Sequence, residues 1–144
     1  DIANARCLDC FAGSGSLGIE ALSRQAQAVT FLEKFANAAQ QLKRNLASLK
    51  TDKGKVVNID SLQFLAQPNP EQPYDIVFVD PPFHQDFVPK VIAYLAQNNW
   101  LSPNALIYVE TEKQHAPLML PEHWQVIKEK TAGQVVSRLI QVSL

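Results

Sequence analysis

The most informative stretch of this 144-residue chain is IVFVDPPF, residues 76–83. Its four apolar residues predict a buried strand. The strand must end at Asp80, because Pro81 and Pro82 supply no N–H group to a neighbouring strand. A carboxylate, two rigid prolines and an aromatic ring therefore stand together at the end of a strand.

These residues suit methylation of an exocyclic amine on a nucleobase. Such an amine is a poor nucleophile, because its lone pair is delocalised into the ring. The Asp80 carboxylate can accept one N–H, and the carbonyl of Asp80 or Pro81 can accept the other, with Pro81 and Pro82 keeping that carbonyl fixed. Phe83 can stack on a base that has left its own stack. We predict that Asp80, Pro81, Pro82 and Phe83 are catalytic. The simpler alternative is a proline turn with Phe83 in the core.

Three more acidic residues follow predicted strands in the same way: Asp9, Glu33 and Asp60. The carboxyl ends of parallel strands lie at one edge of a sheet, where ligands of open α/β sheets bind. Each acid could instead cap the following helix. The presence of all four acids beside a glycine loop favours a shared binding crevice.

Residues 13–18 read GSGSLG, which matches G-x-G-x-x-G and lies between a predicted strand and a predicted helix. Glu33 is placed to bind ribose hydroxyls, which fits both a dinucleotide and S-adenosylmethionine. Asp9 suits the ammonium group of a methionine moiety better than a pyrophosphate, and Asp60 suits the surroundings of adenine. The full predicted cofactor site is Asp9, Phe11, Ala12, Gly13, Ser14, Gly15, Glu33, Lys34, Asp60, Ser61 and Asp80.

Alternating apolar runs and helical patterns predict a doubly wound, mostly parallel α/β sheet. Strands are expected at residues 6–10, 28–32, 55–59, 75–79 and 105–109, with a helix after each of the first four. The helices are expected at 17–25, at 35–50, after Ser61 as its cap, and from Phe87 to Leu95. The last residues predict an antiparallel hairpin that turns at 131–133. We expect one domain over residues 1–144, with a native N-terminal segment missing because the chain begins with Asp1.

The composition narrows the function classes. A formal net charge of −1 gives no support by itself for nucleic-acid binding. Cys7 and Cys10 have no second pair to complete a zinc site, and the histidines show no ligand spacing, so no metal is predicted. Without an apolar stretch of membrane-spanning length or a leader, a cytoplasmic protein, with no membrane partner, is the simplest interpretation. We expect a monomer.

The segments LDCFAGSGSLGIEALSR, VTFLEK and YDIVFVDPPF together resemble class I S-adenosylmethionine-dependent amino-methyltransferases. They are most similar to the small-subunit ribosomal RNA methyltransferase D family, and the similarity extends to KEKTAGQVVSRL. The resemblance implies a seven-stranded Rossmann-like fold, S-adenosylmethionine as cofactor, and methylation of a guanine N2 amine in 16S ribosomal RNA, free or in an assembly particle. It also implies that a basic N-terminal segment that helps to grip RNA is absent.

Other functions remain open from the residues alone. The Asp-Pro-Pro-aromatic motif is shared with adenine-N6 methyltransferases of DNA or RNA. A NAD-dependent oxidoreductase would use the same glycine loop, but Asp80 to Phe83 would then have no role in the reaction. A catalytically silent nucleic-acid-binding module would retain the fold without the reaction.

Overall fold

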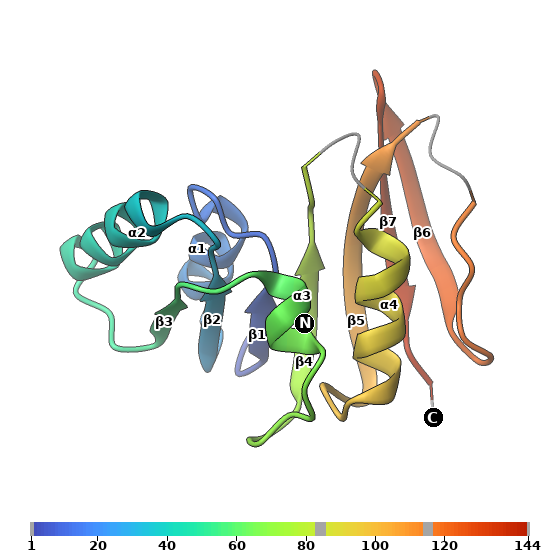
Figure 1. Ribbon diagram of the computed structural model, residues 1–144, viewed down its shortest axis with the longest axis horizontal. Helices are drawn as coiled ribbons and strands as arrows, with labels where there is room; N and C mark the ends of the chain where they lie inside the picture. The colour runs from blue at the N-terminus through green and yellow to red at the C-terminus, as the bar shows by residue number, and fades with distance from the viewer. Residues whose placement is uncertain (1, 83–85, 114–116, 144) are drawn as a thin grey trace.

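A computed structural model describes residues 2–82, 86–113 and 117–143. Seven strands form one sheet in the order β3-β2-β1-β4-β5-β7-β6. The strands β1 to β5 pair in parallel, whereas β7 runs antiparallel to β5 and β6. The predicted doubly wound, mostly parallel sheet with an antiparallel C-terminal hairpin is therefore confirmed (Figure 1). The strands are β1 Arg6–Asp9, β2 Ala28–Leu32, β3 Gly54–Val57, β4 Tyr74–Val79, β5 Leu101–Glu112, β6 Gln125–Ala132 and β7 Val135–Gln141.

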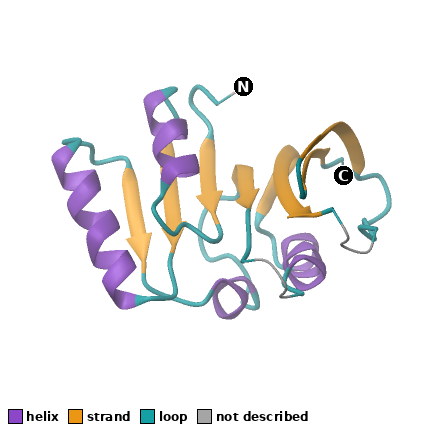
Figure 2. Cartoon of the chain, turned by 90° about the horizontal axis from the view of Figure 1, so that it is seen from above, coloured by secondary structure: helices purple, strands orange, loops and turns teal. Residues whose placement is uncertain are grey.

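Helices cover both faces of the sheet (Figure 2). One face packs against α1 Ser16–Ser23 and α2 Ala36–Ser48, through Phe31 of β2, Ala21 and Leu42. The other packs against α3 Ser61–Leu65 and α4 Val88–Gln97. Phe31 is fully buried, which stabilises the fold by about 1.5–3 kcal/mol. Gly18 allows α1 to lie directly on this ring, because a Cβ there would overlap it.

Several boundaries differ from the sequence-based expectation. The third strand ends at Val57 rather than at residue 59, and the fifth is extended at both ends to Leu101–Glu112. Pairing with β7 explains the added C-terminal part of β5, because Glu112 is still in register with Val135. The hairpin turn does fall at Gly133, whose φ of 60° suits a residue without a side chain.

The switch in strand order positions the site. β1 lies between β2 and β4, and the chain leaves β1 and β2 toward α1 and α2 but leaves β3 and β4 toward α3 and α4. The loops therefore diverge above β1 and β4, which leaves a crevice at the carboxyl edge of the sheet. Among the described residues no helix is both long and apolar enough to cross a membrane.

Candidate active site

A pocket of about 720 Å³ occupies this crevice. The volume lies within the usual range for small-molecule sites. Nine of the predicted site residues line it: Phe11, Gly13, Glu33, Lys34, Asp60, Ser61, Asp80, Pro81 and Pro82. The structure thus brings part of the predicted cofactor set and three of the predicted catalytic residues to a single cavity. Cys10, Leu32, Phe35, Ala38 and Phe87 complete the lining.

The glycine loop passes from β1 into α1 beside this pocket. Gly13 and Gly15 have φ values of 53° and 82°, which side chains disfavour. Gly13 reaches the pocket, whereas Ala12, Ser14 and Gly15 do not line it. Ala12 is buried and its N–H donates to the Leu32 carbonyl at 2.9 Å. These neighbours of Gly13 shape the loop, and any contact of theirs with a cofactor stays a prediction.

Glu33 holds two backbone segments against the pocket. Its Oε1 accepts from the Gly13 N–H at 2.9 Å, and its Oε2 accepts from the Phe35 N–H at 2.8 Å. The side chain is buried, so these bonds compensate for the loss of water. Each carboxylate oxygen can accept a second bond. Glu33 therefore fixes the loop and still offers acceptors to a ribose.

Asp9 lies behind the pocket rather than in its wall. The side chain is 1% exposed, and Oδ1 has no hydrogen-bond partner among the residues that the structure describes. Burial raises the pKa of Asp9 to about 7, although backbone N–H groups of Gly18 and Phe11 oppose the shift. The carboxyl group thus connects the two ends of the glycine loop. Its predicted contact with an ammonium group would require an approach through that loop.

Asp60 and Ser61 follow β3, and the structure corrects the prediction of which one caps α3. The predicted cap of α3 was Ser61, but Asp60 is the cap, and its Oδ1 accepts from the Leu62 N–H at 2.8 Å. Ser61 is the first helical residue, and its Oγ donates to the Cys10 carbonyl. The bond from Ser61 to Cys10 joins the ends of β1 and β3 beside the pocket. Asp60 keeps its second oxygen for a ligand such as adenine.

Asp80 follows β4 directly and is followed by Pro81 and Pro82 in the pocket wall. Burial is the largest cause that raises the pKa of its carboxyl, to about 6, and the neighbouring Glu110 adds to the shift. At neutral pH the carboxylate is therefore ionised and able to accept hydrogen bonds. Phe83, predicted to stack on a base, lies outside the described residues.

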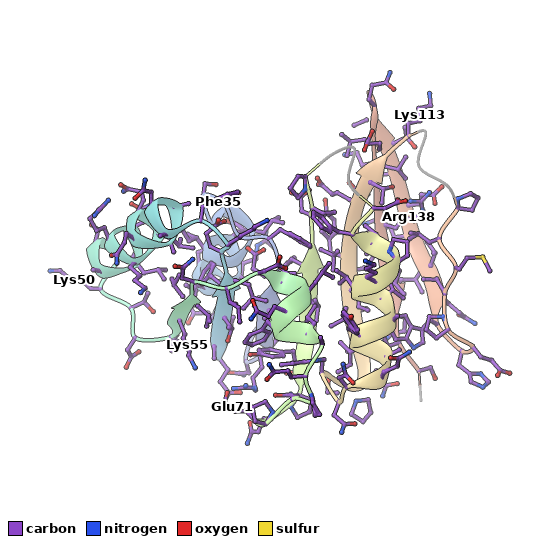
Figure 3. The ribbon with its side chains drawn as sticks, viewed as in Figure 1. Phe35, Lys50, Lys55, Glu71, Lys113 and Arg138 are labelled. Atoms are coloured by element: carbon purple, nitrogen blue, oxygen red, sulfur yellow. The ribbon has the colours of Figure 1, made fainter. Side chains whose placement is uncertain are left out.

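Aromatic residues that the sequence analysis did not assign to the site form two of its walls. Phe87, expected on the apolar face of a helix, precedes α4, and its ring stacks on Phe11 with centroids 5.6 Å apart. Phe35 stands at the start of α2 with 67% of its surface exposed (Figure 3), and Lys34 Nζ lies 5.7 Å from its ring centre. The sequence did contain a signal for Phe35, because it is an apolar residue directly after Glu33 and Lys34 at the end of β2. These rings suit a flat heterocycle in the pocket.

The fold and the pocket together define a class. A doubly wound sheet with an antiparallel final hairpin, a glycine loop after β1 and acids after β2, β3 and β4 is the arrangement of class I methyltransferases. The cofactor of that class is S-adenosylmethionine, and the pocket residues fit its charged and aromatic parts. No group of three His, Cys, Asp or Glu side chains that could hold a metal occurs within the described parts of the chain.

Comparison with known proteins agrees with this class. Residues 1–141 match the family described as conserved hypothetical protein 95. A relative named ribosomal RNA small subunit methyltransferase D from Haemophilus influenzae is 56% identical over 142 residues, covering 97% of this chain and 73% of that protein. Its namesake from Escherichia coli is 49% identical, covering 97% of this chain and 70% of that protein. The chain belongs to this family, the ribosomal RNA small-subunit methyltransferase D family.

Solved structures are also similar. The structure of yhhF from Escherichia coli has a TM-score of 0.94 at 48% identity, over 99% of this chain and 78% of that one. HI0767 from Haemophilus influenzae has a TM-score of 0.93 at 54% identity, over 99% of this chain and 89% of that one. The seven-stranded methyltransferase fold is therefore shared along nearly the whole chain.

Proposed function

We propose that the protein transfers the methyl group of S-adenosylmethionine to the exocyclic N2 amine of a guanine in 16S ribosomal RNA, acting as a single cytoplasmic domain without a metal. The observation that carries the proposal is that Asp80, Pro81 and Pro82 line the same pocket as Gly13 and Glu33. The acceptors for an amine thus adjoin the predicted cofactor-binding residues. The names of the curated relatives support ribosomal RNA as the substrate.

The residues of the chain supply orientation and charge. The cofactor, when bound, supplies an electrophilic methyl group on a sulfonium. Asp80 accepts one N–H of the amine, and the fixed carbonyl of Asp80 or Pro81 accepts the other, so that the nitrogen lone pair is aimed at the methyl carbon. With a cofactor held by the pocket residues, the N–C bond would form as the S–C bond breaks, and the electron pair of that bond would remain on sulfur. The cationic methylated amine then loses one proton, which the Asp80 carboxylate can accept.

Labelling of RNA tests the substrate. The protein is incubated with methyl-labelled S-adenosylmethionine and unmodified small-subunit RNA, free or in assembly particles, and the labelled nucleoside is identified after digestion. N2-methylguanosine is the expected product. N6-methyladenosine would overturn the base assignment in favour of the adenine-N6 alternative. Calorimetric titration should show binding of S-adenosylhomocysteine and not of NAD, and the reverse result would overturn the cofactor assignment.

Replacing Asp80 by alanine tests the catalytic assignment. Asp80→Ala should abolish methyl transfer, because the amine loses one of its two acceptors, while S-adenosylhomocysteine still binds. Asp52→Ala is the matched control, since Asp52 is exposed on the loop before β3 and should leave transfer unchanged. An active Asp80→Ala protein would refute the role given to Asp80.

A further inference from the structure

Glu110 on β5 stands beside Asp80 at the carboxyl edge of the sheet. Val79 of β4 is in register with Val109 of β5, so the next residues along the two strands, Asp80 and Glu110, are neighbours. Adjacent strands are about 4.8 Å apart, which lets two carboxyl groups meet. The neighbouring Glu110 carboxyl also contributes to the raised pKa of Asp80, in agreement with this register. The sequence analysis did not identify Glu110 as a site residue.

The Tyr108 hydroxyl holds the Glu110 side chain in place. The Tyr108 hydroxyl donates to Glu110 Oε1 at 2.6 Å and lies 3.2 Å from the Ser137 hydroxyl on β7. Ser137 is in register with Glu110, so the cluster crosses β4, β5 and β7 in one row. Arg138, the next residue on β7, bonds instead to Thr111 and Glu129. No lysine or arginine within the described residues forms an ion pair with Asp80 or Glu110.

The cluster is accessible from outside. Tyr108, Glu110 and Ser137 are all half-buried, and none of the helices described in residues 2–82, 86–113 and 117–143 lies over β5 and β7 on the α1 side of the sheet (Figure 2). A base that reaches Asp80 could therefore lie along Glu110 as well. Asp80 and Glu110 are neighbouring acceptors with no cation paired to them among the described residues. They therefore suit a ligand with two neighbouring hydrogen-bond donors.

We propose that Glu110 selects guanine at the site: Asp80 accepts an N2–H, and Glu110 accepts the adjacent N1–H of the same Watson–Crick edge. This inference rests on the proposed function. Among the bases with an exocyclic amine, guanine alone has a ring N–H beside it. Adenine and cytosine have a ring nitrogen lone pair there, which would face the Glu110 carboxylate and be repelled. Loss of such a paired contact costs about tenfold to a hundredfold in discrimination.

A substrate analogue without the N1–H tests this contact. 2-Aminopurine keeps the 2-amino group but has a lone pair at N1 in place of the N–H. Once the methylated nucleotide is mapped, small-subunit RNA is prepared by ligation with guanine or 2-aminopurine at that position. The ratio of kcat/KM for the two RNAs is then measured. 2-Aminopurine also lacks O6, but that difference is the same for every protein variant and cancels when variants are compared.

The wild type should prefer guanine over 2-aminopurine, and Glu110→Gln should reduce that preference about tenfold or more, because the new amide N–H can donate to the N1 lone pair. Tyr108→Phe keeps both carboxylates but releases Glu110, so it should lower the preference by a smaller factor. Glu122→Gln is the control with the same change in charge, since its side chain is 88% exposed and does not line the pocket. Its preference should equal that of the wild type.

The outcomes separate the inference from the function on which it rests. A wild type that methylates guanine, with the same preference in Glu110→Gln, overturns the role of Glu110 and leaves the proposed function standing. A wild type that labels adenine, or that leaves guanine unlabelled, overturns both. Where Glu110→Gln is inactive on both RNAs, Tyr108→Phe decides: an unchanged preference in that variant overturns the inference, and a reduced one supports it.

Discussion

Replacing Asp9 by asparagine should make the stability of the fold less dependent on pH. Asp9 is 1% exposed, with no partner for Oδ1 in the described part of the chain, and burial raises the pKa of its carboxyl from 3.8 to about 7. In the unfolded chain the group ionises at its ordinary pKa. The folded state therefore holds one more proton between pH 4 and 7, and its stability falls as the pH rises through that window.

The size of the effect follows from the two pKa values. Each unit of difference corresponds to about 1.4 kcal/mol, and most of the window lies between pH 5 and 8. The free energy of unfolding of the wild type should thus fall by about 2–3 kcal/mol more than that of Asp9→Asn over this range. An asparagine carries no charge, although its amide N–H₂ would take the place of the unpartnered oxygen at a cost of about 1–3 kcal/mol. The slope with pH is therefore the decisive quantity.

Urea denaturation at pH 5, 6, 7 and 8 measures that slope for the wild type, Asp9→Asn and the exposed control Asp52→Asn. The control should follow the wild type at every pH. Parallel curves for the wild type and Asp9→Asn would refute the reasoning, because they would show that burial does not hold a proton on Asp9. Asp80 also titrates in this range but is present in all three proteins, so its contribution cancels in the comparison.

Two further predictions concern the pocket. Methyl transfer should rise with pH through about 6, because Asp80 must be ionised to accept the amine N–H and burial raises its pKa to that value; single-turnover rates with saturating cofactor from pH 5 to 8 measure this, and a flat profile would contradict the role of Asp80. Glu33→Gln should lower the free energy of unfolding by about 1–3 kcal/mol and weaken S-adenosylhomocysteine binding about tenfold, because one amide oxygen cannot replace the two carboxylate oxygens that hold Gly13 and Phe35. Calorimetry and urea denaturation measure both effects, with Glu122→Gln as the control; unchanged stability and binding would contradict the role of Glu33.

The strands and the glycine loop could be predicted from the sequence because the patterns that specify them are local. The apolar run before Asp80 and the glycines at 13, 15 and 18 specify a strand and a tight loop whatever else the chain does. The C-terminal end of β5 could not be predicted in this way. It depends on pairing with β7, in which Val135, the partner of Glu112, is 23 residues further along the chain, and so the sequence analysis stopped the strand at residue 109 rather than at Glu112.

The site was predicted where it depends on strand ends and was missed where it depends on register. Asp60 and Ser61 are both good helix caps, so composition could not decide between them, and the structure selects Asp60 because Ser61 bonds across to the Cys10 carbonyl. Glu110 was missed for a related reason. Its position beside Asp80 follows from the alignment of β4 with β5, which no pattern within either strand contains.

The acids at the carboxyl edge fall into two groups with different consequences for function. Glu33 and Asp60 accept backbone N–H groups, and therefore shape the pocket whether or not a ligand is present. Asp9 and Asp80 are buried or half-buried without a cation, and the pKa of each is raised. Unfavourable burial of carboxylate charge thus occurs at Asp9, beneath the glycine loop, and at Asp80, which adjoins Glu110. A ligand that brings hydrogen-bond donors or a positive charge to those positions relieves this unfavourable energy. Binding should therefore stabilise the protein more at pH 8, where both groups are ionised in the free state, than at pH 5.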